Sequence, residues 1–254
     1  MNNQKLKVTS YKSRRGRKIK IILFTLTFLF IPISLSAVNN PHSSPFNKGG
    51  QEGDLIKGGG GGFAETIDEI VNKVQETYDN AQDLEATFIQ ESFIKMMNKV
   101  EKSEGKVYIK KPGKMRWDYK KPKKQEIVIE GGIIWIYQPE QRQVMKAPFS
   151  NDPRNRTPVS FLYGVGRLKD DFEIKLSKGS SNYIMALTPK GAKGNIEKIF
   201  LEVDSNDYTI QSFSLFDIYG NKTTITFKDI KVNKGLKDSL FHFKVPEGVR
   251  VIEQ

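Results

Sequence analysis

The hydrophobic positions follow a helical period over residues 63–80 and a strand period after residue 84. In the first stretch, apolar side chains recur at three- and four-residue steps, which places them on one face of an amphipathic helix. Charged side chains fill most of the opposite face, so we predict one long helix that packs against the rest of the domain. Its apolar face contains Phe63, Ile67, Ile70, Val71, Val74 and Tyr78.

From residue 84 onward, apolar and polar side chains alternate, which is typical of strands with one buried face. Turn residues separate these stretches, as at Lys-Pro-Gly 111–113 and Gly131-Gly132. About eleven short strands of this kind must curl to bury their shared apolar face. We therefore predict a mainly β fold, an unclosed antiparallel β-barrel covered by the long N-terminal helix and short inserted helices. The alternation is clearest at 84–88, 115–119, 199–203, 225–227 and 241–243.

One segment, residues 147–171, interrupts the alternation and contains three prolines. Thr157-Pro158 is a good helix start, because threonine caps the free N–H groups and proline suits the first helical position. We predict a short helix over residues 158–163. A long loop that carries its own helix between strands is often functional, so we expect a role for this insertion.

Residues 1–37 have the layout of a secretory signal peptide. They carry eight cations and no acid, with an apolar core at 21–33 that small residues follow. Thirteen residues fit a signal core, whereas a transmembrane helix needs roughly 20. We expect cleavage after Ala37; an uncleaved membrane anchor and twin-arginine export through Arg14-Arg15 are the alternatives. Residues 38–62 are rich in Gly, Ser, Asn and Pro and predict a flexible linker, which leaves 63–254 as the folded domain.

The composition excludes several kinds of catalytic and metal-binding site. The net charge of +12 falls to 12 − 8 = +4 once the eight cations of residues 1–37 are set aside. The chain has no cysteine, which excludes disulfides, thiolate metal sites and a cysteine nucleophile. His42 lies in the linker and His242 in a predicted strand, and no hydrolase, kinase or metalloprotease motif is present. We therefore predict no enzymatic activity, no metal and no cofactor.

A basic run at 110–124 is interleaved with Trp117 and Tyr119. In a cytosolic protein it would suggest nucleic-acid binding, but the export signal argues against that partner. Two interpretations remain, a solvated outer face of two strands and a docking surface for anionic lipid heads or an acidic partner. Next along the chain, the apolar residues 127–129 and 133–137 either fill a core or line an open cavity beneath the helix. Periodicity alone leaves both interpretations open.

Four blocks of sequence resemble, in order, the LolA family of periplasmic outer-membrane lipoprotein carriers. They are helix 63–80 leading into DLEATFIQES, the segment 109–144, Thr157-Pro158 followed by VSFLYG, and LFHFKVPEGVRVI at 240–252. The resemblance covers roughly residues 63–252 and implies an unclosed barrel whose helical lid closes an apolar cavity.

The resemblance also implies a function. It predicts a monomeric, non-enzymatic periplasmic chaperone that takes triacylated lipoproteins from an inner-membrane ABC transporter and passes them to an outer-membrane lipoprotein receptor. That receptor has the same fold but is anchored through an N-terminal cysteine, so the absence of cysteine favours the soluble carrier. A glycolipid or lipid-binding protein of the same half-barrel fold, or a lipid-sensing regulatory domain, is the alternative.

The expected lipid-binding side chains lie on inward strand faces and on both helices. In the family, an arginine before the proline of the Lys-Pro-Gly turn holds the lid closed by bonding lid carbonyls. The matching residue is Lys111, our candidate lid latch, and lysine lacks the planar donor fork of arginine. The lipid-binding candidates are Phe88, Met115, Trp117, Tyr119, Ile127, Ile129, Trp135, Tyr137, Ile67, Ile70, Val74, Phe161 and Leu162.

Overall fold

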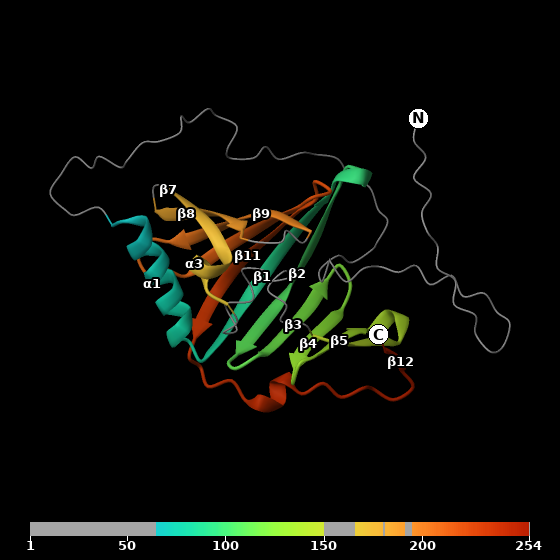
Figure 1. Ribbon diagram of the computed structural model, residues 1–254. Coiled ribbons are helices and arrows are strands. Elements are labelled where there is room, and N and C mark those ends of the chain that lie inside the picture. Colours follow the sequence, from blue (N-terminus) through green and yellow to red (C-terminus); the bar gives the residue numbers. More distant parts are fainter. Residues whose placement is uncertain (1–64, 150–165, 180, 191–194, 254) are drawn as a thin grey trace, which may run out of the picture. The chain divides into compact units, whose positions relative to one another are not determined.

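The computed structural model describes residues 65–149, 166–179, 181–190 and 195–253 (Figure 1). All of them belong to one unit, residues 34–254. The predicted signal peptide, the linker and the inserted helix 158–163 lie outside the described residues. No helix within the described ranges is long and apolar enough to cross a membrane.

Helix α1 (Ile67–Asn80) is the long helix that the sequence predicts, and a capping box fixes its start. The Thr66 hydroxyl accepts a hydrogen bond from the Glu69 backbone at 3.2 Å, and the Glu69 carboxylate accepts one from the Thr66 backbone at 2.7 Å. Ile70, Val71 and Val74 are buried, as predicted. Ile67 is 48% exposed, which corrects its placement on the buried face: it is the first residue after the cap and lies beyond the packed part of the helix.

Twelve strands form one sheet in the part of the chain that the structure describes. Its order is β12-β6-β5-β4-β3-β2-β1-β11-β10-β9-β8-β7, and every neighbouring pair is antiparallel except β12 with β6. Because β12 and β7 remain edges, the sheet is unclosed, and the predicted fold class is confirmed. The strands are β1 (Asp83–Ile94), β2 (Lys99–Lys110), β3 (Lys114–Lys121), β4 (Gln125–Glu130), β5 (Ile133–Gln138), β6 (Gln143–Pro148), β7 (Phe172–Lys178), β8 (Asn182–Pro189), β9 (Ile196–Asp204), β10 (Ile210–Asp217), β11 (Lys222–Val232) and β12 (Arg250–Glu253).

Short helical turns complete the part of the chain that the structure describes. They are the 3-10 turns η1 (Lys95–Met97), η2 (Pro139–Gln141) and η4 (Asp238–Phe241), and the α-helical turn α3 (Leu168–Asp171). The first two connect neighbouring antiparallel strands, so they set the hairpins β1–β2 and β5–β6. The turn α3 leads directly into β7.

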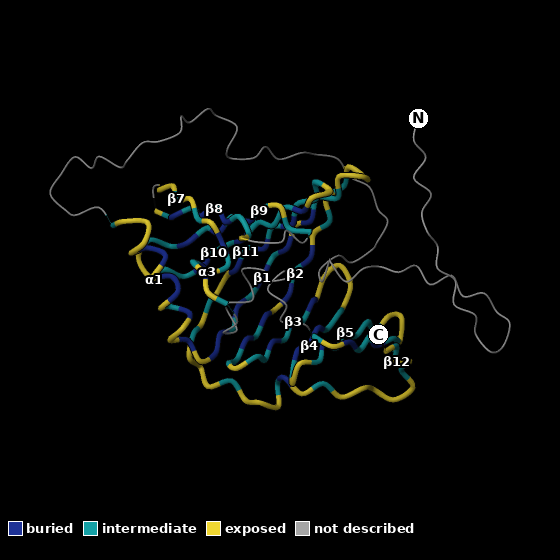
Figure 2. The backbone as a smooth tube through the Cα atoms, viewed as in Figure 1, coloured by how far each residue is buried: buried dark blue, intermediate teal, exposed yellow. Residues whose placement is uncertain are grey.

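One face of the sheet, here called the inner face, carries the core. Register places Val107, Trp117 and Ile127 side by side on β2, β3 and β4. Along β1 to β3, buried residues alternate with more exposed ones, and Figure 2 shows this as alternating dark blue and lighter segments. Gly105 is required here, because a Cβ at this position would lie 2.1 Å from the Asp118 carbonyl oxygen.

The predicted strand over residues 241–243 is wrong. Phe241 ends η4, and the chain then runs without regular structure to β12. This C-terminal segment, residues 238–249, lies against the opposite, outer face of the sheet, where Phe243 stacks on Trp135. The Phe-x-Phe alternation therefore reflects packing of this segment on the face of the sheet. The strand that pairs with the sheet comes further along the chain, where β12 pairs with β6.

Candidate functional site

Six predicted lipid-binding side chains of β1, β3 and β4 lie together on the inner face and are at most 5% exposed. The Phe88 ring packs edge-on against Trp117 at 4.8 Å and against Tyr119 at 4.9 Å between ring centroids. Such pairs add stabilisation beyond the area they bury. The six are Phe88, Met115, Trp117, Tyr119, Ile127 and Ile129.

This cluster has aromatic partners on β10 and β11 that the sequence did not predict. Phe227 of β11 lies 6.4 Å from Trp117, and Phe213 of β10 lies 6.1 Å from Phe227. Phe227 belongs to the alternating stretch 225–227, whereas Phe213 lies in none of the stretches with clear alternation, and period two does not show which strands become neighbours. The two halves therefore share one apolar surface, and its side chains already bury one another.

The inner face becomes polar toward the β1–β2 hairpin. The Tyr119 hydroxyl donates to the Gln90 side-chain oxygen at 2.9 Å, and the Gln90 amide donates to Ser92 at 3.2 Å. Burial raises the pKa of Tyr119 well above its usual value, so the phenol stays neutral. On β2, opposite Ser92, Glu101 pairs with Lys99 at 2.9 Å, while its buried Oε2 has no hydrogen-bond partner among the described residues. One end of the face thus suits hydrocarbon and the other suits polar groups.

Trp135 and Tyr137 are corrections to the predicted site. Both lie on the outer face, where their rings are 5.4 Å and 6.0 Å from Phe243. Register turns Ile134 and Ile136 inward instead, opposite Ile129 and Ile127. The reason is that residues 133–137 are apolar at every position. They contain no alternation that would show which face of the sheet each side chain points to.

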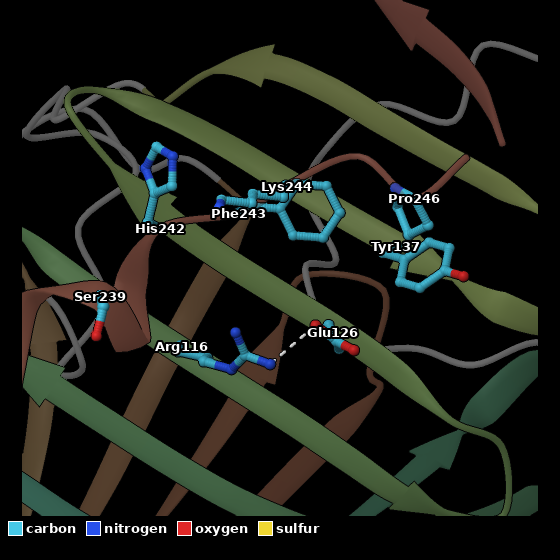
Figure 3. Close-up of a pocket in the computed structure, with 8 residues that line it drawn as sticks. All are labelled: Arg116, Glu126, Tyr137, Ser239, His242, Phe243, Lys244 and Pro246. Atoms are coloured by element: carbon cyan, nitrogen blue, oxygen red, sulfur yellow. Dashed lines mark hydrogen bonds and ion pairs between the residues drawn. The ribbon is translucent and has the colours of Figure 1, made fainter. Parts of the chain in front are cut away.

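A groove of about 530 Å³ lies on the outer face beneath the C-terminal segment (Figure 3). Arg116 forms ion pairs there with Asp118 at 2.7 Å and with Glu126 at 2.9 Å, and it donates to the Leu240 carbonyl at 3.3 Å. Two of the charges that line the groove, Arg116 and Glu126, are therefore paired with each other. Its lining residues are Arg116, Glu126, Tyr137, Ser239, His242, Phe243, Lys244 and Pro246.

Several cations of the basic run 110–124 form ion pairs with acidic side chains of the same chain. Lys110 and Lys114 lie 2.7 Å and 3.3 Å from Asp238 of the C-terminal segment. Lys121 pairs with Glu104 at 2.8 Å. These pairs favour a structural role on the outer face. His242 is largely exposed and lies 3.4 Å from Glu130, so its surroundings do not favour catalysis.

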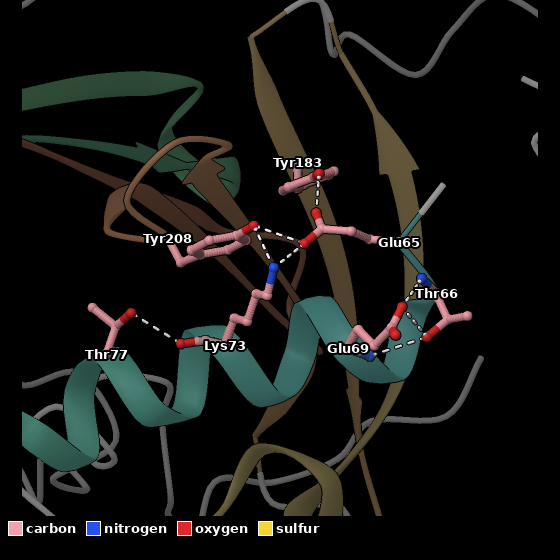
Figure 4. A network of polar contacts seen from close by, with 7 residues as sticks. All are labelled: Glu65, Thr66, Glu69, Lys73, Thr77, Tyr183 and Tyr208. Atoms are coloured by element: carbon pink, nitrogen blue, oxygen red, sulfur yellow. Dashed lines mark hydrogen bonds and ion pairs between the residues drawn. The ribbon is translucent and has the colours of Figure 1, made fainter. Parts of the chain in front are cut away.

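The N-terminal end of α1 is fastened to the sheet by Glu65 (Figure 4). Its carboxylate accepts hydrogen bonds from Lys73, from the Tyr183 hydroxyl at 2.8 Å and from the Tyr208 hydroxyl at 2.9 Å. These bonds, chiefly that of Lys73, lower the pKa of Glu65 to about 2. Burial, and then the bond to Glu65, raise the pKa of Tyr183 to about 12. Since Tyr183 points to the inner face with its partner Val203, α1 lies on that face.

The C-terminal end of α1 is held by Lys111. Its ammonium donates to the Tyr78 carbonyl and, at 3.2 Å, to the Asp79 carbonyl. A cation at this position also interacts favourably with the helix dipole. Desolvation lowers the pKa of Lys111. The structure therefore brings the predicted latch to the last turn of α1, while Phe161 and Leu162 of the predicted inserted helix lie outside the described residues.

Two further contacts attach α1. The Ile210 backbone N–H donates to the Tyr78 hydroxyl at 2.8 Å, and the Leu168 backbone N–H donates to the Gln75 side chain at 3.0 Å. The second contact ties α3, at the end of the insertion, to α1. Over the described ranges, no group of three or more His, Cys, Asp or Glu side chains could hold a metal ion.

Comparisons with known proteins agree with this geometry. The family described as outer membrane lipoprotein carrier protein LolA matches residues 79–244. An outer-membrane lipoprotein carrier protein of Methylococcus capsulatus is 31% identical over 184 residues, covering 72% of this chain and 86% of that protein. Its counterpart in Legionella pneumophila is 31% identical over 196 residues, covering 76% and 92%. A solved structure, an uncharacterized conserved protein from Thermus thermophilus, aligns with a TM-score of 0.50 at 14% identity over 75% of this chain and 100% of that one, which shows the fold alone.

Proposed function

This chain belongs to the LolA family of periplasmic outer-membrane lipoprotein carriers, a family of non-enzymatic transport proteins, and from that premise we propose that its inner face shelters lipoprotein acyl chains during transfer. The observation that supports this is the buried apolar surface around Phe88 and Trp117, on the same inner face of the sheet as α1. The predicted lipoprotein carrier family is confirmed, and the acyl-chain site is our proposal.

The free energy needed to expose acyl chains to water shows why a sheltering surface is needed. Exposing an acyl chain of about 16 carbons to water costs roughly 13 kcal/mol, at ~0.8 kcal/mol per methylene. Two or three such chains make unassisted passage through water negligible. A protein surface that replaces the bilayer as the apolar environment removes most of that penalty. Its affinity must remain close to that of a membrane, or release would fail.

The cover of this surface is suited to moving. Helix α1 is fastened by side-chain contacts near its two ends, through Glu65 and through Lys111. Exposed ion pairs and single hydrogen bonds are each worth about 1 kcal/mol or less. The helix also buries Ile70, Val71 and Val74, so bound acyl chains must replace this apolar packing as well as the few polar contacts. We therefore expect cargo binding to displace α1 from the inner face of the sheet.

Lys111 is the proposed latch of this cover. Its single ammonium reaches the Tyr78 and Asp79 carbonyls, whereas the planar fork of arginine would add donors. Lys111→Arg should hold α1 more firmly and slow lipoprotein loading, and Lys111→Met should accelerate it. Stopped-flow uptake of a fluorescent triacylated lipopeptide measures both rates.

The same proposal extends to the binding partners of the carrier and to its location in the cell. We propose that a monomer receives triacylated lipoproteins from an inner-membrane ABC transporter and delivers them to an outer-membrane lipoprotein receptor. We further propose that residues 1–37 direct export and are removed, so that the mature chain begins near Val38. N-terminal sequencing of periplasmic protein tests this, and an intact Met1 in a membrane pellet would contradict it.

The chain carries two tryptophans, one on each face of the sheet, which gives a direct test of where acyl chains bind. Trp135→Phe leaves Trp117 as a reporter of the inner face, and Trp117→Phe leaves Trp135 as a reporter of the outer face. A triacylated lipopeptide with brominated acyl chains should quench Trp117 strongly and Trp135 little, because bromine quenches only at short range.

Circular dichroism of both variants serves as the folding control. Equal quenching of the two reporters, or quenching of Trp135 alone, would rule out the inner face as the acyl site. A brominated glycolipid provides the competing cargo. Quenching of Trp117 by the glycolipid but not by the lipopeptide would favour the alternative lipid-binding function.

A further inference from the structure

Five of the eight exposed large apolar side chains in the described residues gather on two hairpin ends. Met96 is 93% exposed and Tyr219 is 62% exposed. Scattered surface apolar residues need no explanation, but a contiguous exposed group marks an interaction site. We call this group the two-hairpin tip: Met96, Met97 and Val100 at the β1–β2 connection, and Ile218 and Tyr219 at the β10–β11 turn.

The two hairpins are joined although they are far apart in sequence. Strand β1 pairs with β11, with Phe93 opposite Lys222. The Lys95 backbone N–H donates to the Asn221 side-chain oxygen at 3.0 Å. A Cβ at Gly220 would lie 2.6 Å from the Lys95 side chain, so this lysine packs directly on the β10–β11 turn. Figure 1 shows the green η1 turn beside the orange-red end of this second hairpin, and Figure 2 shows exposed backbone there.

The β10–β11 turn is held in place by a buried carboxylate. Asp217 is 1% exposed and accepts hydrogen bonds from the Tyr219 backbone at 2.9 Å and from the Asn221 backbone at 2.8 Å. It also accepts one from the Asn221 side-chain amide at 2.8 Å. The exposed Ile218 and Tyr219 are therefore presented by a preorganised turn, which lowers the entropy lost when they bind a surface.

Cations flank the apolar group. Lys95 and Lys222 have no acidic partner among the residues that the structure describes, and Lys222 lies 5.5 Å from the centre of the Phe216 ring. By contrast, Lys102 and Lys99 on β2 pair with Glu91 and Glu101. The unpaired positive charge thus lies beside the exposed apolar side chains.

We propose that the two-hairpin tip is a membrane contact that inserts its apolar side chains among the head groups of an anionic phospholipid bilayer. Methionine and isoleucine supply apolar area, tyrosine suits the boundary between apolar and wet regions, and lysine extends its ammonium toward phosphates. A side chain as exposed as Met96 needs no complementary pocket in a fluid phase, whereas a protein partner would have to provide one.

The position of the tip fits transfer at a membrane. Strand β1 begins beside the last turn of α1 and ends at the tip, with the polar residues Gln90 and Ser92 of the inner face in between. A tip in the head-group region would bring the polar end of the inner face nearest the bilayer. This last step depends on the proposed carrier function, but membrane binding by the tip does not.

Sedimentation with lipid vesicles tests the inference. Vesicles of phosphatidylcholine and phosphatidylglycerol are compared with vesicles of phosphatidylcholine alone, using exported protein without cargo. The double variant Met96→Ser, Ile218→Ser should bind the anionic vesicles about tenfold more weakly than wild type. Lys95→Gln with Lys222→Gln should reduce binding only where phosphatidylglycerol is present.

The matched control is Val245→Ser with Val251→Ser, which removes two exposed apolar side chains of the C-terminal region. It should bind vesicles as wild type does. Equal binding by the tip variant and wild type would overturn the inference, as would an equal loss in the control. Self-association in the ultracentrifuge that disappears in the tip variant, without vesicle binding, would identify a second copy as the occupant instead.

Cargo binding separates this inference from the proposed function. The Trp135→Phe protein, which keeps Trp117 as its reporter, is compared with the same protein carrying Met96→Ser and Ile218→Ser. A brominated lipopeptide in detergent should quench Trp117 equally in both proteins. If quenching fails in both proteins while vesicle binding still depends on the tip, the acyl site is wrong and the membrane contact stands.

Discussion

The two tryptophans occupy opposite faces of the same half of the sheet, and their surroundings differ. Trp117 on β3 is 1% exposed and packs edge-on against Phe88, within an aromatic cluster drawn from β1, β3 and β11. Trp135 on β5 is only partly buried, stacked on Phe243 with the Lys146 ammonium 5.4 Å from its ring. Burial on the inner face is thus mutual among strands, whereas burial on the outer face depends on one added segment.

The two covers are attached in different ways. On the inner face, α1 is held by side chains at its ends, Glu65 and Lys111. On the outer face, the C-terminal segment ends in β12, whose backbone pairs with β6 from Arg250 to Glu253. A backbone ladder resists opening more than a few exposed side-chain contacts do. Under the proposed function, the helix on the inner face is the cover that moves.

The largest effect should come from truncating the two tryptophans. Trp117→Ala should lower the free energy of unfolding by about 3–5 kcal/mol, because it empties the centre of a packed cluster. Trp135→Ala should lower it by about 1–2 kcal/mol, since it removes only a partly exposed stack. Urea denaturation measures both. Equal losses would show that the two faces contribute alike to stability, against the comparison drawn above.

The second effect concerns the cover of the outer face. Arg116→Met should cost about 1–3 kcal/mol, because it leaves Asp118 and Glu126 without their common cation and removes the bond to the Leu240 carbonyl. Amide hydrogen exchange should rise over residues 238–249 and stay unchanged in α1. A rise confined to α1 would mean that the covers are coupled.

Several parts of this arrangement could be predicted from sequence. The helical period of α1 and the alternation of β1 and β3 predict most of the buried side chains, with Ile67 as the exception, because side chains that repeat on one face pack against the same core. For β5, the sequence could not predict which side chains point to the inner face, since all of residues 133–137 are apolar. The C-terminal Phe-x-Phe was mistaken for a strand, because packing on a finished sheet produces the same alternation as strand pairing.

The polar contacts of the site were harder to predict. Lys111 was found through its place before the proline of the turn, but its partners, the carbonyls of the last turn of α1, depend on tertiary structure. Glu65 gave no signal, because Tyr183 and Tyr208 lie more than a hundred residues away in sequence. The two-hairpin tip was equally hidden, since its halves are joined only by the pairing of β1 with β11.

The third effect concerns the moving cover. Lys111→Met should destabilise α1 by about 1 kcal/mol, because it removes a cation and its hydrogen bonds from the helix C-terminus. Hydrogen exchange of α1 should rise while residues 238–249 stay protected, the reverse of the Arg116 variant. Lys111→Arg should restore protection. Unchanged exchange in Lys111→Met would remove this lysine from the attachment of the helix.

The smallest effect is the pH dependence of the other end of α1. The pKa of Glu65 is lowered from its usual 4.5 to about 2 in the folded protein, so the bound state favours the carboxylate. The stabilisation it provides is complete above pH 4.5 and decreases as the pH falls from there toward about 2, because the released side chain takes up a proton first. Glu65→Gln cannot titrate at this position, and it should weaken α1 by a fraction of the Lys111 effect at neutral pH. Urea denaturation of both proteins between pH 7 and pH 3 should therefore show their midpoints converging below pH 4.5. A constant difference across that range would mean that Glu65 holds the helix equally well when protonated, and that the N-terminal attachment depends on the two tyrosine hydroxyls rather than on charge.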